Sequence, residues 1–366
     1  MITIKKITTY LESIAPSPYQ ESYDNAGLII GDPNAVVKGV LVCLDAVEGV
    51  IEEAIAKGCN LIVAHHPIVF KGLKRLNGKN YVERVVMKAI KHDIAIFAIH
   101  TNLDSVYHHG VNAIIAERLG LLNTRILAPK RQLLMKLETF VPTPFTQGVL
   151  NALYDAGAGR IGDYENCSFR SEGVGTFKPK GKAQPFIGKL GQDEEVQEHR
   201  LEVVFPAHKE RDILKALRAA HPYEEVAYYL HRLENEQEEV GSGMIGQLAD
   251  PMDPLPFLHF LKSKMQTACV RHTQLIEKKI ATVAVCGGAG GFLLNDAIRA
   301  GADIFVTADY KYHEFFDADG LIIIADIGHF ESEQFTIELL YDLIIKKYSE
   351  ITVFSTNFIT NPVRYL

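Results

Sequence analysis

Short apolar runs alternate with amphipathic segments along the first third of the chain. The β-branched run 37 to 45 (VKGVLVCLD) precedes a segment of helical spacing that ends in glycine, 47 to 58 (VEGVIEEAIAKG). The strand-like run 60 to 67 (NLIVAHHP) follows, then a helical pattern near VERVVMKAIKHD and the run 94 to 104 (IAIFAIHTNLD). This alternation predicts a parallel sheet with helices on both faces.

The last third of the chain shows the same alternation. Its strand-like runs are 280 to 291 (IATVAVCGGAGG), 303 to 314 (DIFVTADYKYHE) and 321 to 333 (LIIIADIGHFESE), and a long amphipathic helix then extends to Tyr348. We therefore expect an α/β core whose N-terminal half is 1–129 and whose C-terminal half is 236–366. The two ends of the chain should be halves of one parallel sheet.

The segment between these halves, 130–235, contains an internal repeat. At an offset of 64, eight of 28 positions are identical: Leu137/Leu201, Glu138/Glu202, Pro142/Pro206, Leu150/Leu214, Ala152/Ala216, Leu153/Leu217, Ala156/Ala220 and Tyr164/Tyr228. Each copy has the pattern of a strand that ends in proline, a helix and a second strand. Two copies predict an inserted βαββαβ domain of the ferredoxin-like type. The alternative is two unrelated strand-helix pairs of similar composition.

Composition narrows the class of protein. A length of 366 residues favours two or three domains, and 47% hydrophobic with 23% charged residues is an ordinary globular balance. The net charge of -7 and the lack of a Lys/Arg-rich run argue against direct binding of nucleic acid. The N-terminus has no apolar core of signal-peptide length, and no run approaches the roughly 18 apolar residues of a membrane span. We expect a cytoplasmic protein that does not enter a membrane.

Potential metal ligands follow the predicted strands. In open parallel sheets, ligands bind beyond the carboxyl ends of the strands. Five cysteines without a C-x-x-C pair indicate reduced thiols, so sulfur ligands are not expected. The residues at the strand ends are instead imidazoles and carboxylates: Asp45; His65 and His66; His100 and Asp104; Asp309 and His313; Asp326, His329 and Glu333. Their convergence predicts a metal site.

Three of these groups have simpler alternatives. His65 and His66 precede Pro67, which takes the chain out of extended geometry, and an isolated pair of this kind could be surface loop histidines. His329 and Glu333 are four apart on one helix face, a spacing that also suits a solvated first turn. Asp104 could be an Asx turn or a helix cap. Ligands without sulfur suit zinc, our first expectation, and also iron, manganese, cobalt or nickel.

The glycine-rich run VCGGAGGF follows a strand and precedes a helix. Backbone N–H groups of Gly287, Gly288 and Gly290 could cradle a phosphate there. The run lacks the lysine of a P-loop and the full dinucleotide-binding spacing. A tight turn with close helix packing is the alternative that we favour.

Taken together, the motifs resemble those of the Nif-three-like family of dinuclear-metal proteins, whose bacterial members are called GTP cyclohydrolase 1 type 2 homologues. The similarity covers essentially the whole chain and is carried by YDNAGLIIGD (23 to 32), AHHPIVF (64 to 70), HTNLDS (100 to 105), VCGGAGG (285 to 291), TADYKYHE (307 to 314) and IGHFESE (327 to 333). The family usually has tryptophan where this chain has Tyr23.

The resemblance implies that two metal ions are bound by His65, His66, Asp104, His329 and a bridging Glu333. It also implies a toroidal homohexamer, and the segment HPYEEVAYY (221 to 229) resembles the signal-protein-like or cation-tolerance-like insertion of longer members.

The resulting hypothesis is a two-metal hydrolase acting on a nucleotide, either by GTP cyclohydrolase-like ring opening or at a phosphoester. The resemblance implies GTP as the substrate. His100 or His313 is the candidate general acid or base, and both could instead orient other ligands. The competing hypothesis is a non-enzymatic, ring-shaped regulatory scaffold or metal-handling protein.

Overall fold

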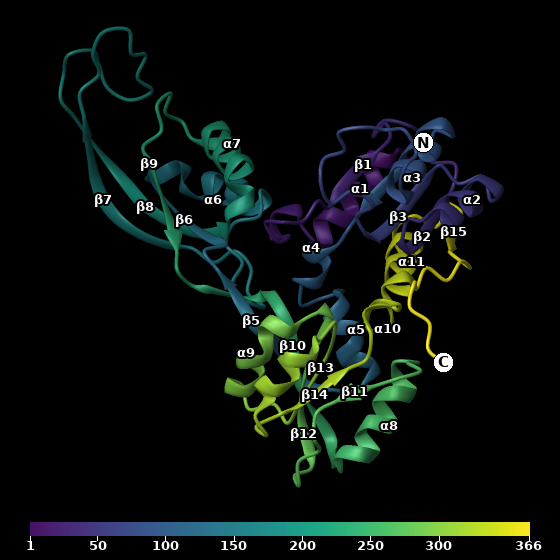
Figure 1. Cartoon of the computed structure of the whole chain (residues 1–366). Helices are drawn as coiled ribbons and strands as arrows, with labels where there is room; N and C mark the ends of the chain where they lie inside the picture. Colours follow the sequence, from purple (N-terminus) through teal and green to yellow (C-terminus); the bar gives the residue numbers. More distant parts are fainter. The chain divides into compact units, whose positions relative to one another are not determined.

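The computed structural model describes residues 1–366, which form two compact units (Figure 1). Unit 1 combines Met1–Pro129 with Glu239–Leu366, and unit 2 is Lys130–Glu238. The structure is therefore a mixture of helices and several sheets, with the middle of the chain packed separately from its two ends.

The first sheet of unit 1 is built mainly from the N-terminal part of the chain. Its order is β1-β4-β3-β2-β15, with strands β1 (Gly27–Ile30), β2 (Val40–Asp45), β3 (Leu61–His66), β4 (Ala95–Ala98) and β15 (Val353–Ser355). The strands from β4 to β15 are parallel, and β1 is antiparallel to β4. The central strands are buried almost throughout, as their continuous apolar runs require.

Helices cover this sheet with their apolar faces. Val50, Ile51, Val85 and Ala89 of α2 and α3 pack with the strands in one hydrophobic cluster, and α11 contacts β2, β3 and β15. Asn80 begins α3 by accepting a hydrogen bond from the Glu83 N–H. The N-terminal part of unit 1 contains the helices α1 (Ile4–Ile14), η1 (Ser17–Tyr19), α2 (Glu48–Ala56), α3 (Tyr81–Lys91), α4 (Thr101–Asp104) and α5 (Val111–Arg118). The C-terminal helix α11 (Thr336–Lys347) also belongs to this part of the fold.

The second sheet of unit 1 has the order β11-β14-β13-β12-β10-β5. Strands β12, β13 and β14 are parallel, whereas β10 and β11 run antiparallel to β12 and β14. The strands are β5 (Leu122–Arg131), β10 (Glu236–Met252), β11 (Arg271–His272), β12 (Ile280–Ala289), β13 (Ile304–Ala308) and β14 (Ile323–Asp326). The accompanying helices are α8 (Pro254–Lys264), η4 (Gly291–Leu293), α9 (Leu294–Arg299), η5 (Tyr312–Ala318) and α10 (His329–Glu333).

The prediction of one shared sheet is wrong, because unit 1 contains two separate sheets. Each half of unit 1 contributes one edge strand to the sheet of the other half. The C-terminal strand β15 joins the N-terminal sheet beside β2, and β5 from the N-terminal half joins the C-terminal sheet beside β10. Apolar runs predict that strands exist but not which strands pair, so two completed sheets fit the same pattern. The predicted final helix is also divided into α10 and α11.

Unit 2 is a four-stranded antiparallel sheet with two helices. Its order is β7-β8-β6-β9, formed by β6 (Leu134–Pro142), β7 (Phe169–Phe177), β8 (Glu194–Pro206) and β9 (Tyr228–Leu233). The helical segments are η2 (Thr143–Phe145), α6 (Thr146–Asp155), η3 (Ala207–Lys209) and α7 (Glu210–Ala220). Leu137, Leu201 and Val203 share a hydrophobic core with Leu150 and Leu217 of the helices. The helices therefore cover one face of the sheet.

The two copies of the repeat follow the same course in unit 2. Each contributes a strand that ends in proline, then a helix and a second strand. Glu138 of β6 pairs directly with Glu202 of β8, and these two residues occupy equivalent positions of the repeat. The copies are thus related by an approximate two-fold axis at this pair. Tyr164 departs from the repeat, since it precedes β7 whereas Tyr228 begins β9.

Neither unit has a helix with the length and apolar character required to cross a membrane.

Candidate metal centre

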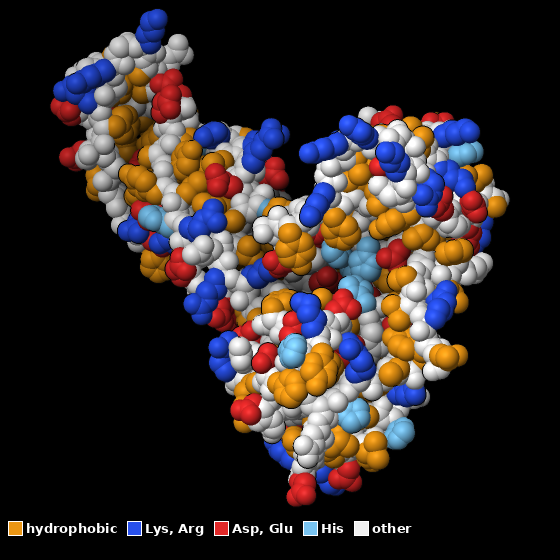
Figure 2. All heavy atoms as spheres, viewed as in Figure 1, with side chains coloured by type: hydrophobic (Ala, Val, Ile, Leu, Met, Phe, Trp, Pro, Cys, Tyr) orange, Lys and Arg blue, Asp and Glu red, His pale blue; other side chains and the backbone are white.

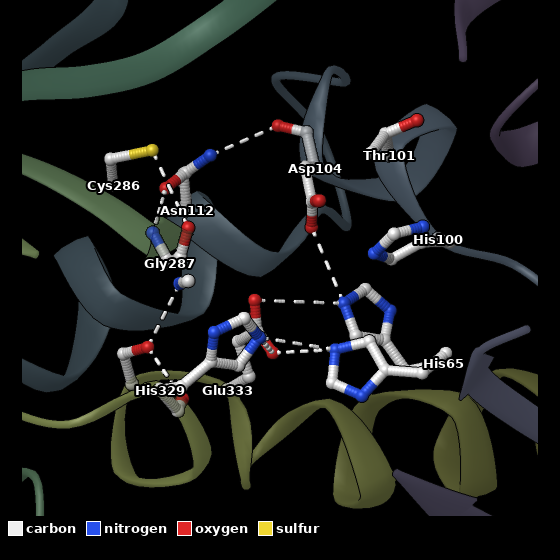
Figure 3. A network of polar contacts seen from close by, with 12 residues as sticks. His65, His100, Thr101, Asp104, Asn112, Cys286, Gly287, His329 and Glu333 are labelled. Carbon is white, nitrogen blue, oxygen red and sulfur yellow. Dashed lines mark hydrogen bonds and ion pairs between the residues drawn. The ribbon is translucent and has the colours of Figure 1, made fainter. Parts of the chain in front are cut away.

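Five of the predicted residues come together where strands of both sheets of unit 1 end (Figure 3). His65 and His66 are the last residues of β3, and Asp104 ends α4, the single helical turn that follows β4. His329 and Glu333 are the first and last residues of α10, which follows β14. The carboxyl ends of the parallel strands therefore supply all five side chains, as expected for open sheets.

The side chains form two groups of three that share Glu333. One group is His65, Asp104 and Glu333, the other is His66, His329 and Glu333, and the ligand atoms within each lie within 4.8 Å of one another. Glu333 Oε1 lies 3.9 Å from His65 Nε2, whereas Oε2 lies 2.9 Å from His66 Nε2 and 3.1 Å from His329 Nε2. Each carboxylate oxygen thus faces a different group, and each group could hold a metal ion.

Two atoms of the first group are buried without a hydrogen-bond partner. They are His65 Nε2 and Asp104 Oδ1, which lie 3.5 Å apart. Leaving buried polar atoms unpaired is costly, so such atoms in a native fold call for a partner. Imidazole nitrogen and carboxylate oxygen are ligands for zinc and other divalent transition metals. The residues present therefore fit a cation that contacts both atoms.

The other ring nitrogen of each histidine is held in place. Nδ1 of His65 donates to the carbonyl oxygen of Ile99 at 2.8 Å. Nδ1 of His66 donates to Asp45 at 2.8 Å, and Nδ1 of His329 donates to Asp309 at 2.7 Å. These bonds fix the orientation of the rings and turn every Nε2 toward Glu333. In metal sites, the ring nitrogen of a histidine that does not bind the metal is commonly held by a hydrogen bond of this kind.

The charges at the centre are strongly coupled. Burial lowers the pKa of His65 to about 3. Burial opposes the protonation of His66, but Asp45 and Glu333 outweigh it and raise the pKa of His66 to about 10. The pKa of His329 is raised to about 11 against the same burial effect, chiefly by Glu333 and Asp309. Protons on these imidazoles would have to leave before the nitrogens could bind a metal, so metal binding should release protons.

The two carboxyl groups shift in opposite directions. Burial and the nearby charge of Glu333 raise the pKa of Asp104. Burial also opposes the ionisation of Glu333, but His329 and His66 outweigh it and lower the pKa of Glu333. Without a cation, the centre therefore keeps Glu333 ionised between protonated imidazoles.

His100 stands beside this centre and is oriented by Asp24. Its ring lies 5.4 Å from that of His65 and 5.2 Å from that of His66, measured between ring centroids. Nδ1 of His100 donates to Asp24 Oδ1 at 2.8 Å, and Asp24 Oδ2 accepts from the backbone N–H of Thr101 at 3.1 Å. Burial opposes the ionisation of Asp24, but the hydrogen bonds from His100 and from the Thr101 hydroxyl lower its pKa to about 2.

His313 lies apart from these residues. It is an exposed residue of η5, its ring contacts are Tyr312 and Phe316, and it does not line the cavity at the centre. The strand end after β13 contributes Asp309 instead. Of the two predicted candidates for a general acid or base, the structure brings only His100 to the centre.

The three glycines predicted as a phosphate cradle already donate their N–H groups. Gly287 donates to Asn112, Gly288 to Ser332 and Gly290 to Thr307, at 3.0, 2.9 and 3.0 Å. Gly288 has a φ of +63°, and a Cβ at this position would lie 2.4 Å from Glu333 Oε1. The glycine-rich run therefore lets the backbone approach Glu333 closely, which matches the packing alternative.

A cavity of about 1270 Å³ opens over the centre. His66, His100, Asp104, His329 and Glu333 all line it, together with two arginines and several exposed aromatic rings: Arg271, Arg364, Tyr23, Phe70, Phe292, Phe358 and Tyr365. The cavity is large enough for a nucleotide-sized ligand.

Sequence reasoning named Asp45 and Asp309, which hold two of the histidines, but missed other residues that support the site. Asp24 lies in the quoted motif YDNAGLIIGD but follows no strand, so its contact with His100 had no local signal. Asn112 joins the two halves of the centre, since it donates to the carbonyl oxygen of Asp104 and accepts from Gly287. Thr360 donates to Asp45 at 2.6 Å from the C-terminal segment. Only the folded chain brings these residues to the site.

Fold and site together define an α/β protein with a His- and carboxylate-rich centre that could hold metal ions. The profile of the family described as Duf34/NIF3 (NGG1p interacting factor 3) matches residues 2–362, and the chain belongs to this family.

Curated relatives and solved structures agree with this assignment. The chain is 40% identical to a Bacillus subtilis (strain 168) protein named GTP cyclohydrolase 1 type 2 homolog, over 99% of this chain and 98% of that protein. A crystal structure of a Bacillus cereus protein related to NIF3 has a TM-score of 0.86 at 38% identity, covering 100% of this chain and 99% of that one. A Staphylococcus aureus protein gives a TM-score of 0.80 at 31% identity, again over 100% and 99%.

Proposed function

We propose that this protein is a metal-dependent hydrolase that binds two divalent ions and acts on a nucleotide. The observation that carries the proposal is the position of Glu333, whose two oxygens face two separate groups of ligands. His65 and Asp104 would complete one site, and His66 and His329 the other. We propose zinc as the first metal to test, with iron, manganese, cobalt or nickel as alternatives, because imidazole and carboxylate ligands suit all of them.

Two ions held by these residues would supply Lewis-acid chemistry that activates water and offsets negative charge on the substrate. The protein's own part in proton transfer falls to His100. Because Nδ1 of His100 donates to Asp24, its Nε2 carries the free electron pair and can accept a proton. Asp24 thus acts as a positioning residue that sets the tautomer of His100, and the bond to Thr101 holds Asp24 in turn.

The proposed substrate class rests on the cavity and on the relatives. Exposed aromatic rings on the cavity wall could stack with a base, and Arg271 and Arg364 could contact phosphates. Several curated relatives are named GTP cyclohydrolase 1 type 2 homolog. We therefore propose GTP as the first substrate to test, with ring opening or phosphoester hydrolysis as the reaction.

Two further proposals concern the architecture. The βαββαβ order and the strand order β7-β8-β6-β9 support a ferredoxin-like sandwich for unit 2. The resemblance to ring-forming members supports a toroidal homohexamer, which sedimentation of the purified protein would test. These proposals do not depend on catalysis.

Turnover of GTP by zinc-loaded protein tests the enzyme proposal directly. Glu333→Gln should lose both metal sites and activity, and His100→Gln should keep its metals but lose about 100-fold or more in kcat. Glu338→Gln is the matched control, because Glu338 is a 72% exposed side chain on α11. Activity that survives Glu333→Gln would indicate a contaminating enzyme. Two bound ions without turnover of GTP would favour the scaffold hypothesis.

A further inference from the structure

Unit 2 contains a cavity of its own, formed entirely by its residues. It has a volume of about 580 Å³ and lies over β7 and β8, beneath the loop 178–193. This volume is typical of pockets that bind small molecules. From its lining we propose that unit 2 binds a small organic cation, an amine with an apolar body, at this cavity.

The room in the cavity comes from missing side chains on β7. Ser171, Gly173 and Gly175 alternate along this strand and line the cavity. A Cβ on Gly173 would meet no atom within 4 Å, whereas a Cβ on Gly175 would lie 2.2 Å from Glu198 Oε2. Glycine within a strand weakens it and often marks the close approach of another group. Here two glycines clear a space in front of a carboxylate.

That carboxylate, Glu198 of β8, is buried and pairs with no Lys or Arg. The nearby His221 uses both ring nitrogens in bonds to the Phe140 carbonyl oxygen and the Tyr223 N–H. Glu198 is 7% exposed, and its hydrogen bond is from the Tyr223 hydroxyl to Oε1, at 2.8 Å. The two basic residues that line the cavity are engaged elsewhere, Arg200 with Glu138 and Glu202, and Lys178 with Asp193. A buried carboxylate without a cation is costly. The site therefore lacks one positive charge.

The remaining charges on the wall have the same sign. Glu224 and Glu225 also line the cavity, so with Glu198 the acidic residues outnumber the basic ones there. Burial and the Glu198 carboxylate raise the pKa of Tyr223, which keeps its hydroxyl protonated as a donor. An anionic ligand would meet repulsion, whereas an ammonium group would gain an ion pair with Glu198.

Aromatic rings supply the rest of the wall. Phe140, Phe177, Phe186, Tyr223 and Tyr229 all line the cavity, and the Phe177 and Tyr223 ring centroids are 5.8 Å apart. Figure 2 shows hydrophobic side chains gathered on this part of unit 2, with acidic side chains at their border. Aromatic faces attract cations and accommodate an apolar body. The combination with one buried carboxylate is suited to an amine that carries an aromatic or aliphatic group.

The loop above the cavity is held in place by hydrogen bonds. The Gly191 N–H donates to the carbonyl oxygen of Pro179 at 2.9 Å, and the Gln184 N–H donates to the Glu224 carboxylate at 2.7 Å. These contacts position Phe186 and Ile187 as part of the wall. A wall that is already ordered reduces the entropic cost of binding.

Calorimetric titration of the full-length protein with 2-phenylethylamine tests this proposal, with phenylacetate as the anionic counterpart. We expect saturable binding of the amine alone. Glu198→Gln, which keeps an acceptor for Tyr223, should weaken binding at least about tenfold through loss of the ion pair. Gly173→Leu should abolish it by filling the cavity. Glu195→Gln is the matched control, because Glu195 is an exposed residue of β8 outside the cavity.

Unchanged metal content and circular dichroism would show that each variant is folded. Equal affinity for phenylacetate, or unchanged amine affinity in Glu198→Gln, would overturn the proposal. The absence of saturable amine binding would also overturn the proposal. If Gly173→Leu dissociated an oligomer, a second copy of the chain would cover this face, and the proposal would again be wrong.

Discussion

His65 Nε2 and Asp104 Oδ1 lie 3.5 Å apart in the interior of unit 1, and neither atom has a hydrogen-bond partner. His65 lies at the end of β3 and Asp104 in the connection after β4. The carbonyl oxygen of Ile99 holds the His65 ring, and Asn112 holds the backbone carbonyl of Asp104. A shared cation would satisfy both atoms at once. On the other side of Glu333, His66 Nε2 and His329 Nε2 lie 2.9 and 3.1 Å from Oε2. The two sets of contacts together are the physical basis of the proposed two-metal centre.

The first prediction concerns metal stoichiometry. Elemental analysis of protein purified without chelator should give about two ions per chain. His329→Ala and Asp104→Asn should each lose one ion preferentially, because they belong to different groups, and Glu333→Gln should lose both. His259→Ala, an exposed residue of α8, serves as the control. Retention of both ions by His329→Ala would mean that the ligand assignment is wrong.

The second prediction concerns the glycine beside Glu333. Gly288→Ala should destabilise the protein by more than the roughly 1–2 kcal/mol that a left-handed backbone costs a non-glycine residue, because the added Cβ would displace Glu333. Zinc affinity should fall at least about tenfold for the same reason. Urea unfolding and zinc titration measure the two effects.

Gly301→Ala is the matched control for this substitution. Gly301 has a φ of +76°, but a Cβ there would meet no atom within 4 Å. Substitution of Gly301 should therefore lower the free energy of unfolding only by the cost of the left-handed backbone, and it should leave zinc affinity unchanged. Equal zinc affinity in both variants would show that Gly288 does not control the position of Glu333.

The third prediction concerns pH and Asp24. Hydrogen bonds hold its pKa at about 2 in the folded protein, below its usual value of 3.8. A lowered folded-state pKa stabilises the fold above the unfolded pKa, so this contribution of about 2 kcal/mol should be present above about pH 4 and lost as the pH falls toward 2. Urea unfolding of metal-free protein between pH 5 and pH 3 should show the decline.

Asp24→Asn should be less stable at pH 5 and should show a flatter pH dependence than the parent protein. Asp342→Asn, on the exposed side of α11, should show the same pH dependence of stability as the parent protein. If Asp24→Asn and the parent lose stability in parallel, the carboxylate is not stabilised by His100 and Thr101 as the geometry indicates.

The fourth prediction concerns unit 2. Replacing 130–238 with a short flexible linker should leave a soluble protein that binds two metals, because all five proposed ligands lie in unit 1. β5 and β10, which lead into and out of unit 2, are neighbours in one sheet, so a short linker can close the gap. The excised segment should show mixed α/β circular dichroism. If the deletion variant is insoluble or metal-free, unit 1 needs unit 2 to complete its hydrophobic core, and the prediction is wrong.

The sequence by itself determined the local features of this protein. Apolar runs identified β2, β3, β4, β12, β13 and β14, and the residues at or just beyond their ends included every member of the two groups at Glu333. The offset of 64 identified the two strand-helix-strand copies of unit 2. These features are readable because strand periodicity and the location of ligands at strand ends depend on neighbouring residues.

Tertiary structure alone decided which elements meet. The exchange of β15 and β5 between two sheets, the bond from His100 to Asp24, and the separation of His313 from the centre all join or divide residues far apart in the chain. Hydrophobic patterning specifies a buried face but not its partner, so strand pairing is settled by packing of the whole chain. The contacts made by Asp24, Asn112 and Thr360 follow from that packing and carry no local signal of their own.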